Sequence, residues 1–116
     1  MTEERRFHKR LKLELDSMYR AHDGANSFTT TVINISCNGI CLETRELLEL
    51  GKQIELKVFL ETGEMVLLNG EVVWCQTLTD RQGYSVGLRI NSGEENHKEL
   101  FERYYNLRVL YPPRES

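Results

Sequence analysis

The chain has 116 residues, of which 40% are hydrophobic and 28% are charged, so it can form one domain with its own core and is too short to suggest a second. Its 15 Lys and Arg against 18 Asp and Glu give a net charge of −3, which argues against a protein that coats nucleic acid with its whole surface. Three cysteines without a signal-peptide pattern argue against a disulfide framework and favour a cytoplasmic setting. Because no apolar stretch approaches the roughly 18 residues of a membrane span, we expect no membrane insertion.

The positive charges are concentrated near the N-terminus. A cluster without any acidic residue contains Arg5, Arg6, Lys9, Arg10 and Lys12. Such a cluster is compatible with a local site for an anion, and the alternative is an ordinary solvated basic tail. We expect residues 1–10 to form a flexible arm, because they contain few apolar anchors.

Six short strands are predicted to follow this arm. Apolar and polar residues alternate, or β-branched residues cluster, at 11–20, 28–35, 40–44, 53–61, 65–77 and 84–90. The connections between them are mostly of turn length, which favours antiparallel pairing. The segment 45–51 is predicted to be a loop or a single helical turn that ends at Gly51.

The hydrophobic period changes at residue 92. Ser92 followed by Glu95 is a capping-box pattern, and apolar residues then recur at helical spacing at Leu100, Phe101, Tyr104 and Tyr105. The sequence therefore predicts a helix at about 93–108. Since six twisted strands bury their apolar faces best by closing, the expected fold class is all-β. Residues 11–116 should form a six-stranded antiparallel, Greek-key-like β-barrel with this C-terminal α-helix over an open end or edge.

A polar motif ends the second predicted strand. Asn34 and Ser36 are two residues apart, so a continuous strand would place them on one face, with Ile33 and Ile35 pointing into the core. Gly39 follows where a sharp turn would require a positive φ. Taken alone, the motif is equally typical of an ordinary turn assisted by Asn or Ser side chains.

The two polar segments together resemble the signature elements of the PilZ domain, Arg-x-x-x-Arg and Asp/Asn-x-Ser-x-x-Gly. The residues that match are Arg6 and Arg10 for the first element and Asn34, Ser36 and Gly39 for the second. The segments "GEVVW" and "YSVGLRI" also resemble the last two barrel strands of that family, so the resemblance covers nearly the whole chain. It implies that cyclic di-GMP, a bacterial second messenger, binds on the outside of a six-stranded barrel.

The resemblance also implies a role for each motif residue. Arg6 and Arg10 would clamp the bases and phosphates, because a guanidinium fork matches guanine O6 and N7 and forms strong charge-assisted bonds to phosphate. Asn34 and Ser36 would accept hydrogen bonds from guanine N1–H and the N2 amino group. Gly39, which has no side chain, would let the backbone approach the ligand closely.

Two further residues extend this candidate site. In PilZ domains an arginine directly before the first motif arginine accompanies capture of two intercalated ligands, so Arg5 raises the alternative of one or two cyclic di-GMP per chain. Arg5 is equally compatible with a solvated tail. Trp74 lies toward the end of the fifth strand, where it could stack on a base. The alternative is burial in the core, since Trp74 is an even number of residues from Val72 and the apolar residues before it and would lie on the same face of the strand.

The expected function is a binding module that senses cyclic di-GMP and passes the signal on, through ordering of its arm, to an unidentified downstream protein. We expect no enzyme, cofactor, metal site or nucleic-acid partner. The alternatives are a PilZ-like protein-interaction module without nucleotide binding and an oligonucleotide-binding barrel, which a basic groove with interleaved aromatics would favour. Because Tyr104 and Tyr105 suit a dimer face as well as a barrel lid, the oligomeric state stays open.

Overall fold

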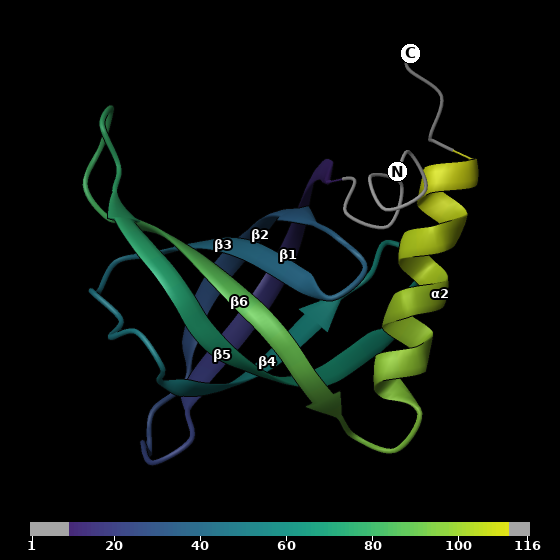
Figure 1. Cartoon of the computed structure of the whole chain (residues 1–116), viewed down its shortest axis with the longest axis horizontal. Coiled ribbons are helices and arrows are strands. Elements are labelled where there is room, and N and C mark those ends of the chain that lie inside the picture. Colours follow the sequence, from purple (N-terminus) through teal and green to yellow (C-terminus); the bar gives the residue numbers. More distant parts are fainter. Residues whose placement is uncertain (1–9, 112–116) are drawn as a thin grey trace, which may run out of the picture.

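The computed structural model describes residues 10–111, so Arg5, Arg6 and most of the predicted arm lie outside the described residues. Six strands form a closed antiparallel barrel in the order β1-β2-β3-β6-β5-β4, followed by one helix (Figure 1). The elements are β1 (Leu11–Ala21), β2 (Phe28–Ile35), β3 (Gly39–Thr44), β4 (Gln53–Phe59), β5 (Met65–Thr77), β6 (Tyr84–Gly93) and α2 (His97–Leu110). The expected fold class is confirmed.

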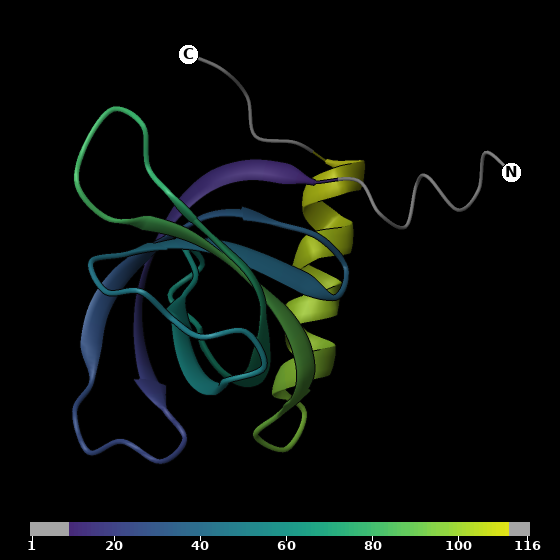
Figure 2. The same ribbon diagram turned by 60° about the vertical axis from the view of Figure 1, so that its left-hand side comes forward.

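The barrel closes because alternating apolar residues from every strand fill its interior. The inward side chains of the second half of the barrel are Ile54, Leu56, Val58, Val66, Leu68, Val72, Val86, Leu88 and Ile90, all of them buried. This is the face that the alternation predicts for these strands. Figure 2 shows the strands wrapped around this common core, and the connection 45–52 between β3 and β4 contains turns and no helix.

Two of the register shifts in the barrel change the facing of residues whose direction was predicted from the sequence. One lies between Val32 and Asn34 on the β2–β3 ladder. Val32 and Ile35 are both 0% exposed, whereas Ile33 is only half-buried, so the predicted inward direction of Ile33 is wrong. The other shift lies between Val72 and Trp74 on the β5–β6 ladder. A β-bulge of this kind inserts one residue and reverses the facing of the residues after it.

The C-terminal helix begins later than the capping-box pattern predicts. β6 continues through Gly93 and includes Ser92, and α2 starts at His97. The N-cap residue, Asn96, makes no side-chain capping bond. The first turn is instead fixed to the barrel, since the Leu67 backbone N–H donates to His97 Nδ1 over 2.8 Å. The prediction that Ser92 caps the helix is therefore wrong.

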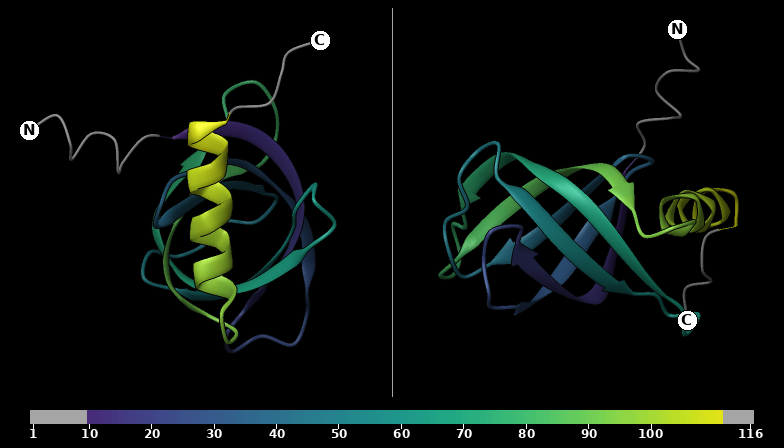
Figure 3. Two further views of the ribbon diagram at one scale, coloured as in Figure 1. Left: turned by 90° about the vertical axis from the view of Figure 1, so that its right-hand side faces the viewer. Right: turned by 90° about the horizontal axis from the view of Figure 1, so that it is seen from below.

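α2 lies across one open end of the barrel (Figure 3). Its buried residues are Phe101, Tyr104 and Tyr105. The Tyr104 hydroxyl donates to Glu61 in the β4–β5 turn, and Arg108 pairs with the same carboxylate. Burial raises the pKa of Tyr104, and the hydrogen bond to Glu61 raises it further. In residues 10–111, no helix combines the length and the apolar composition of a membrane span.

The buried face of α2 makes a stability prediction. Phe101→Ala should lower the free energy of unfolding by about 3–5 kcal/mol, because it leaves a cavity under the helix. Urea denaturation followed by circular dichroism measures this change. The matched control is Leu107→Ala on the same helix, where the side chain is 49% exposed and the expected loss is about 0.5 kcal/mol or less. Equal losses of unfolding free energy in the two variants would contradict the packing of α2 against the barrel.

Candidate ligand-binding site

A row of residues on the outside of the barrel joins four strands. Asn34 of β2 pairs with Cys41 of β3, Cys41 pairs with Gly87 of β6, and Gly87 pairs with Trp74 of β5. Their chain neighbours on β3 and β6 belong to the core, and side chains alternate along a strand, so this row faces outward. Residues that are far apart in the sequence thus lie side by side on the outer face, where Asn34 and Trp74 are half-buried and Cys41 and Gly87 are covered by neighbouring groups.

The turn between β2 and β3 brings the predicted motif residues together. The Ser36 backbone N–H donates to the Gly39 carbonyl over 2.8 Å. A Cβ atom at Gly39 would lie 3.1 Å from Ser36 Oγ and 3.9 Å from Arg10 Nη1. The structure therefore places Arg10, Ser36 and Gly39 in one small region at the start of β3.

Gly39 is needed here for a reason other than the predicted one. Among the glycines of residues 10–111, positive φ angles occur at Gly51, Gly63 and Gly83. Gly39 is not among them, so the expectation of a positive φ is wrong. A side chain at this position would instead crowd Ser36 Oγ and the Leu88 carbonyl oxygen, which lies 3.3 Å from the Cβ position. Close approach of neighbouring groups is thus the physical reason for glycine.

Asn34 carries an acceptor that the described part of the protein does not use. Its Oδ1 atom is buried and has no hydrogen-bond partner among residues 10–111. Burial of a polar atom without a partner costs free energy that a donor from a ligand would restore. Asn34 therefore has an acceptor to offer, and the role that the resemblance implies for it stays a prediction.

Trp74 lies on the outer surface and is only half-buried, because the register shift after Val72 reverses its facing. The parity argument for core burial is therefore wrong. Its indole covers the backbone of Gly87, where an added Cβ would be 2.2 Å from Trp74 Nε1. The ring is thus held flat against β6, in the same outward row as Asn34, and presents an aromatic surface on which a base can stack.

The site is electrostatically connected to the helix through Arg10. Burial raises the pKa of Tyr105 on α2, the nearby Cys37 raises it further, and the positive charge of Arg10 lowers it. Arg10 and Cys37 therefore lie close enough to influence this buried hydroxyl. Among the residues that the structure describes, no group of His, Cys, Asp or Glu side chains is arranged to hold a metal ion.

Sequence reasoning missed two residues at this surface. Gly87 makes room for Trp74, and Arg89 lies directly opposite Gly39 on the β3–β6 ladder. An isolated glycine inside a strand often marks close approach of another group, so Gly87 had a usable signal. Arg89 had none, because its position beside Gly39 depends on the register between two strands that are distant in sequence.

Comparison with protein families identifies the chain. The PilZ domain model matches residues 4–107, which include both motif elements. The chain belongs to the PilZ domain family. Comparison with curated proteins gives no significant match in sequence.

Solved structures with the same fold support this assignment. The inhibitor of motility MotI/DgrA of Bacillus subtilis superposes with a TM-score of 0.75 at 17% identity, over 92% of this chain and 52% of MotI. MrkH of K. pneumonia, in complex with c-di-GMP, gives 0.70 at 16% identity, over 89% of this chain and 52% of MrkH. PlzA of Borreliella burgdorferi, also in complex with c-di-GMP, gives 0.58 at 12% identity, over 97% of this chain and 56% of PlzA. This PilZ chain thus spans about half the length of these proteins.

The contact between Trp74 and Gly87 predicts a spectroscopic change. Gly87→Ala should push the indole off β6, shift its fluorescence to longer wavelength and lower the free energy of unfolding by about 1–3 kcal/mol. The signal is unambiguous, because the chain contains 1 Trp. Gly24→Ala is the control, since the nearest atom to its Cβ position is at 3.4 Å. An unchanged spectrum in Gly87→Ala would contradict the packing described here.

Proposed function

We propose that this PilZ domain is a receptor for cyclic di-GMP and that the ligand binds on the outer face of β2, β3, β6 and β5. The observation that carries the proposal is the meeting of Arg10 from the first motif with Ser36 and Gly39 from the second. Two motifs that are separated in the chain supply a cation and polar groups to one place. This is the combination that a nucleotide with a phosphodiester requires.

The chemistry of each group fits a guanine nucleotide. Asn34 Oδ1, buried and without a described partner, accepts a hydrogen bond from the N1–H or N2 amino group of guanine. Arg10 contributes charge-assisted bonds to the phosphodiester or a bidentate contact to guanine O6 and N7. Trp74 offers a flat surface on which a second base stacks. The c-di-GMP complexes of MrkH and PlzA, which share the fold, support the choice of this ligand.

The proposed signalling mechanism uses the N-terminal arm. Arg5 and Arg6 precede Arg10 in the sequence, and their charges would be drawn to a bound phosphodiester together with it. Binding would order the arm against the barrel and present a changed surface to a downstream protein. The proximity of Arg10 to Tyr105 gives the ligand a route to helix α2 as well. In this role the domain acts as a binding module and catalyses no reaction.

The first test is calorimetric titration of the full chain with cyclic di-GMP. The wild-type protein should bind it, and should not bind a linear dinucleotide or a short single-stranded oligonucleotide with comparable affinity. Arg10→Ala should abolish the signal, and Asn34→Ala should weaken binding by at least about tenfold, because each removes a direct ligand contact.

Arg45→Ala is the matched control for this titration, since Arg45 is exposed and follows the other end of β3. It should leave the affinity unchanged. No heat of binding from the wild-type chain would contradict the receptor role and would favour the protein-interaction module. Preference for the single strand would instead favour an oligonucleotide-binding barrel.

The second test concerns stoichiometry. If Arg5 captures a second, intercalated ligand, the wild-type chain should bind two cyclic di-GMP, and Arg5→Ala should reduce the number to one while the first site keeps its affinity. Titration at protein concentrations well above the dissociation constant measures the molar ratio. A ratio of one in the wild-type protein would show that Arg5 has no such role.

A further inference from the structure

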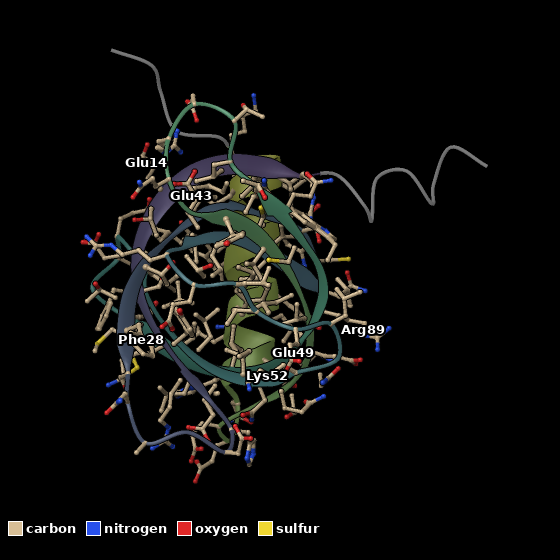
Figure 4. All side chains as sticks on the ribbon, turned by 90° about the vertical axis from the view of Figure 1, so that its left-hand side faces the viewer. Glu14, Phe28, Glu43, Glu49, Lys52 and Arg89 are labelled. Atoms are coloured by element: carbon tan, nitrogen blue, oxygen red, sulfur yellow. The ribbon has the colours of Figure 1, made fainter. Side chains whose placement is uncertain are left out.

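Arg89 is a cation beside the proposed site that neither motif accounts for. Its Cα lies opposite that of Gly39 in the β3–β6 ladder and opposite that of Glu71 in the β5–β6 ladder. Side chains of directly paired residues have Cβ atoms about 5 Å apart, so Arg89 projects from the outer face of β6 beside Gly39. Figure 4 shows Arg89 extending outward from the barrel wall.

Two arginines border Gly39 from different segments of the chain. Arg10 Nη1 lies 3.9 Å from the position that a Cβ at Gly39 would take. Arg89 lies on the neighbouring strand, next to the same glycine. An anion on the outer face at the start of β3 can therefore meet Arg10, which directly precedes β1, and Arg89 of β6. Two cations beside one another make a better phosphate site than one.

In the structure, Arg89 is paired with a carboxylate on its other side. Its Nη2 atom donates to Glu71 Oε1 over 2.6 Å, and the two side chains are 57% and 28% exposed. An ion pair with this exposure contributes little to stability, because water screens both charges. The pair is therefore easily exchanged for another anion, and a guanidinium with five N–H donors has the capacity to engage one.

We propose that Arg89 is a further ligand-contacting residue and that Glu71 competes with the phosphodiester of the ligand for its guanidinium. The inference rests on the proposed function and adds to it a residue, Glu71, that adjusts the affinity for the ligand. In the free protein the Glu71 carboxylate holds Arg89 toward β5. When cyclic di-GMP lies over Gly39, Arg89 exchanges the carboxylate for the phosphodiester. Glu71 thereby sets the affinity without touching the ligand.

The test is a double-mutant cycle on the full chain, titrated with cyclic di-GMP. Arg89→Met keeps the aliphatic stem and removes the charge, and it should weaken binding roughly tenfold. Glu71→Gln removes the competing charge and should tighten binding about threefold, in line with the small free energy of an exposed ion pair. In the Arg89→Met background, Glu71→Gln should have no effect, because its influence acts through Arg89.

The chain offers a matched control pair. Arg81 and Glu43 form an ion pair in which the side chains are 51% and 26% exposed, nearly the same as in the Arg89–Glu71 pair. Glu43 lies four residues along β3 from Gly39, or roughly 13 Å at the rise of a strand, and Figure 4 shows Glu43 well apart from Arg89. Arg81→Met and Glu43→Gln should leave the affinity unchanged. Thermal unfolding of every variant confirms that the fold is intact.

The outcomes separate this inference from the receptor proposal. If the wild-type chain binds cyclic di-GMP and Arg89→Met binds equally well, Arg89 makes no contact and the inference fails alone. If Glu71→Gln tightens binding to the same extent with and without Arg89, the carboxylate acts by general repulsion and the exchange is refuted. If the wild-type chain does not bind, the receptor role fails and the inference fails with it.

Discussion

The pairing of β3 with β6 is the interaction on which the rest of the structure depends. Together with the pairing of β1 and β4, it joins the first three strands to the last three and closes the barrel. The same ladder sets Gly39 opposite Arg89 and Cys41 opposite Gly87. Neither half of the barrel carries the whole proposed site, so the site requires the β3–β6 ladder.

Local sequence patterns were sufficient to predict the strands, but not to predict which side chains of each strand face the core. Alternation predicts all six strands because burial on one side of a pleated strand has a period of two. It does not predict that Val32 is buried with Ile35, or that Trp74 turns outward, because a register shift is a property of two strands together. The capping-box prediction failed for a related reason, since Ser92 pairs with Asn69 of β5 and so continues the ladder.

The same distinction, between local sequence and strand pairing, applies to the residues of the candidate site. Arg10, Asn34, Ser36 and Gly39 could be named from the sequence because they belong to two short motif elements, and the structure brings Arg10, Ser36 and Gly39 together at the start of β3. Their role in binding stays a prediction. The contributions of Gly87 and Arg89 could not be named in this way, because each follows from what lies on the adjacent strand. Glycine at 39 illustrates the difference. The sequence shows that the residue is there, whereas the structure shows that crowding, and not an unusual backbone angle, requires it.

The start of β1 and the last turns of α2 lie on the same side of the barrel, as the views of Figures 2 and 3 agree. Arg10 stands at the beginning of that strand, and Tyr105 is close to it on the helix. A module fused at either end of the described residues would consequently be attached on the side of the barrel where Arg10 lies, beside the site proposed for the nucleotide.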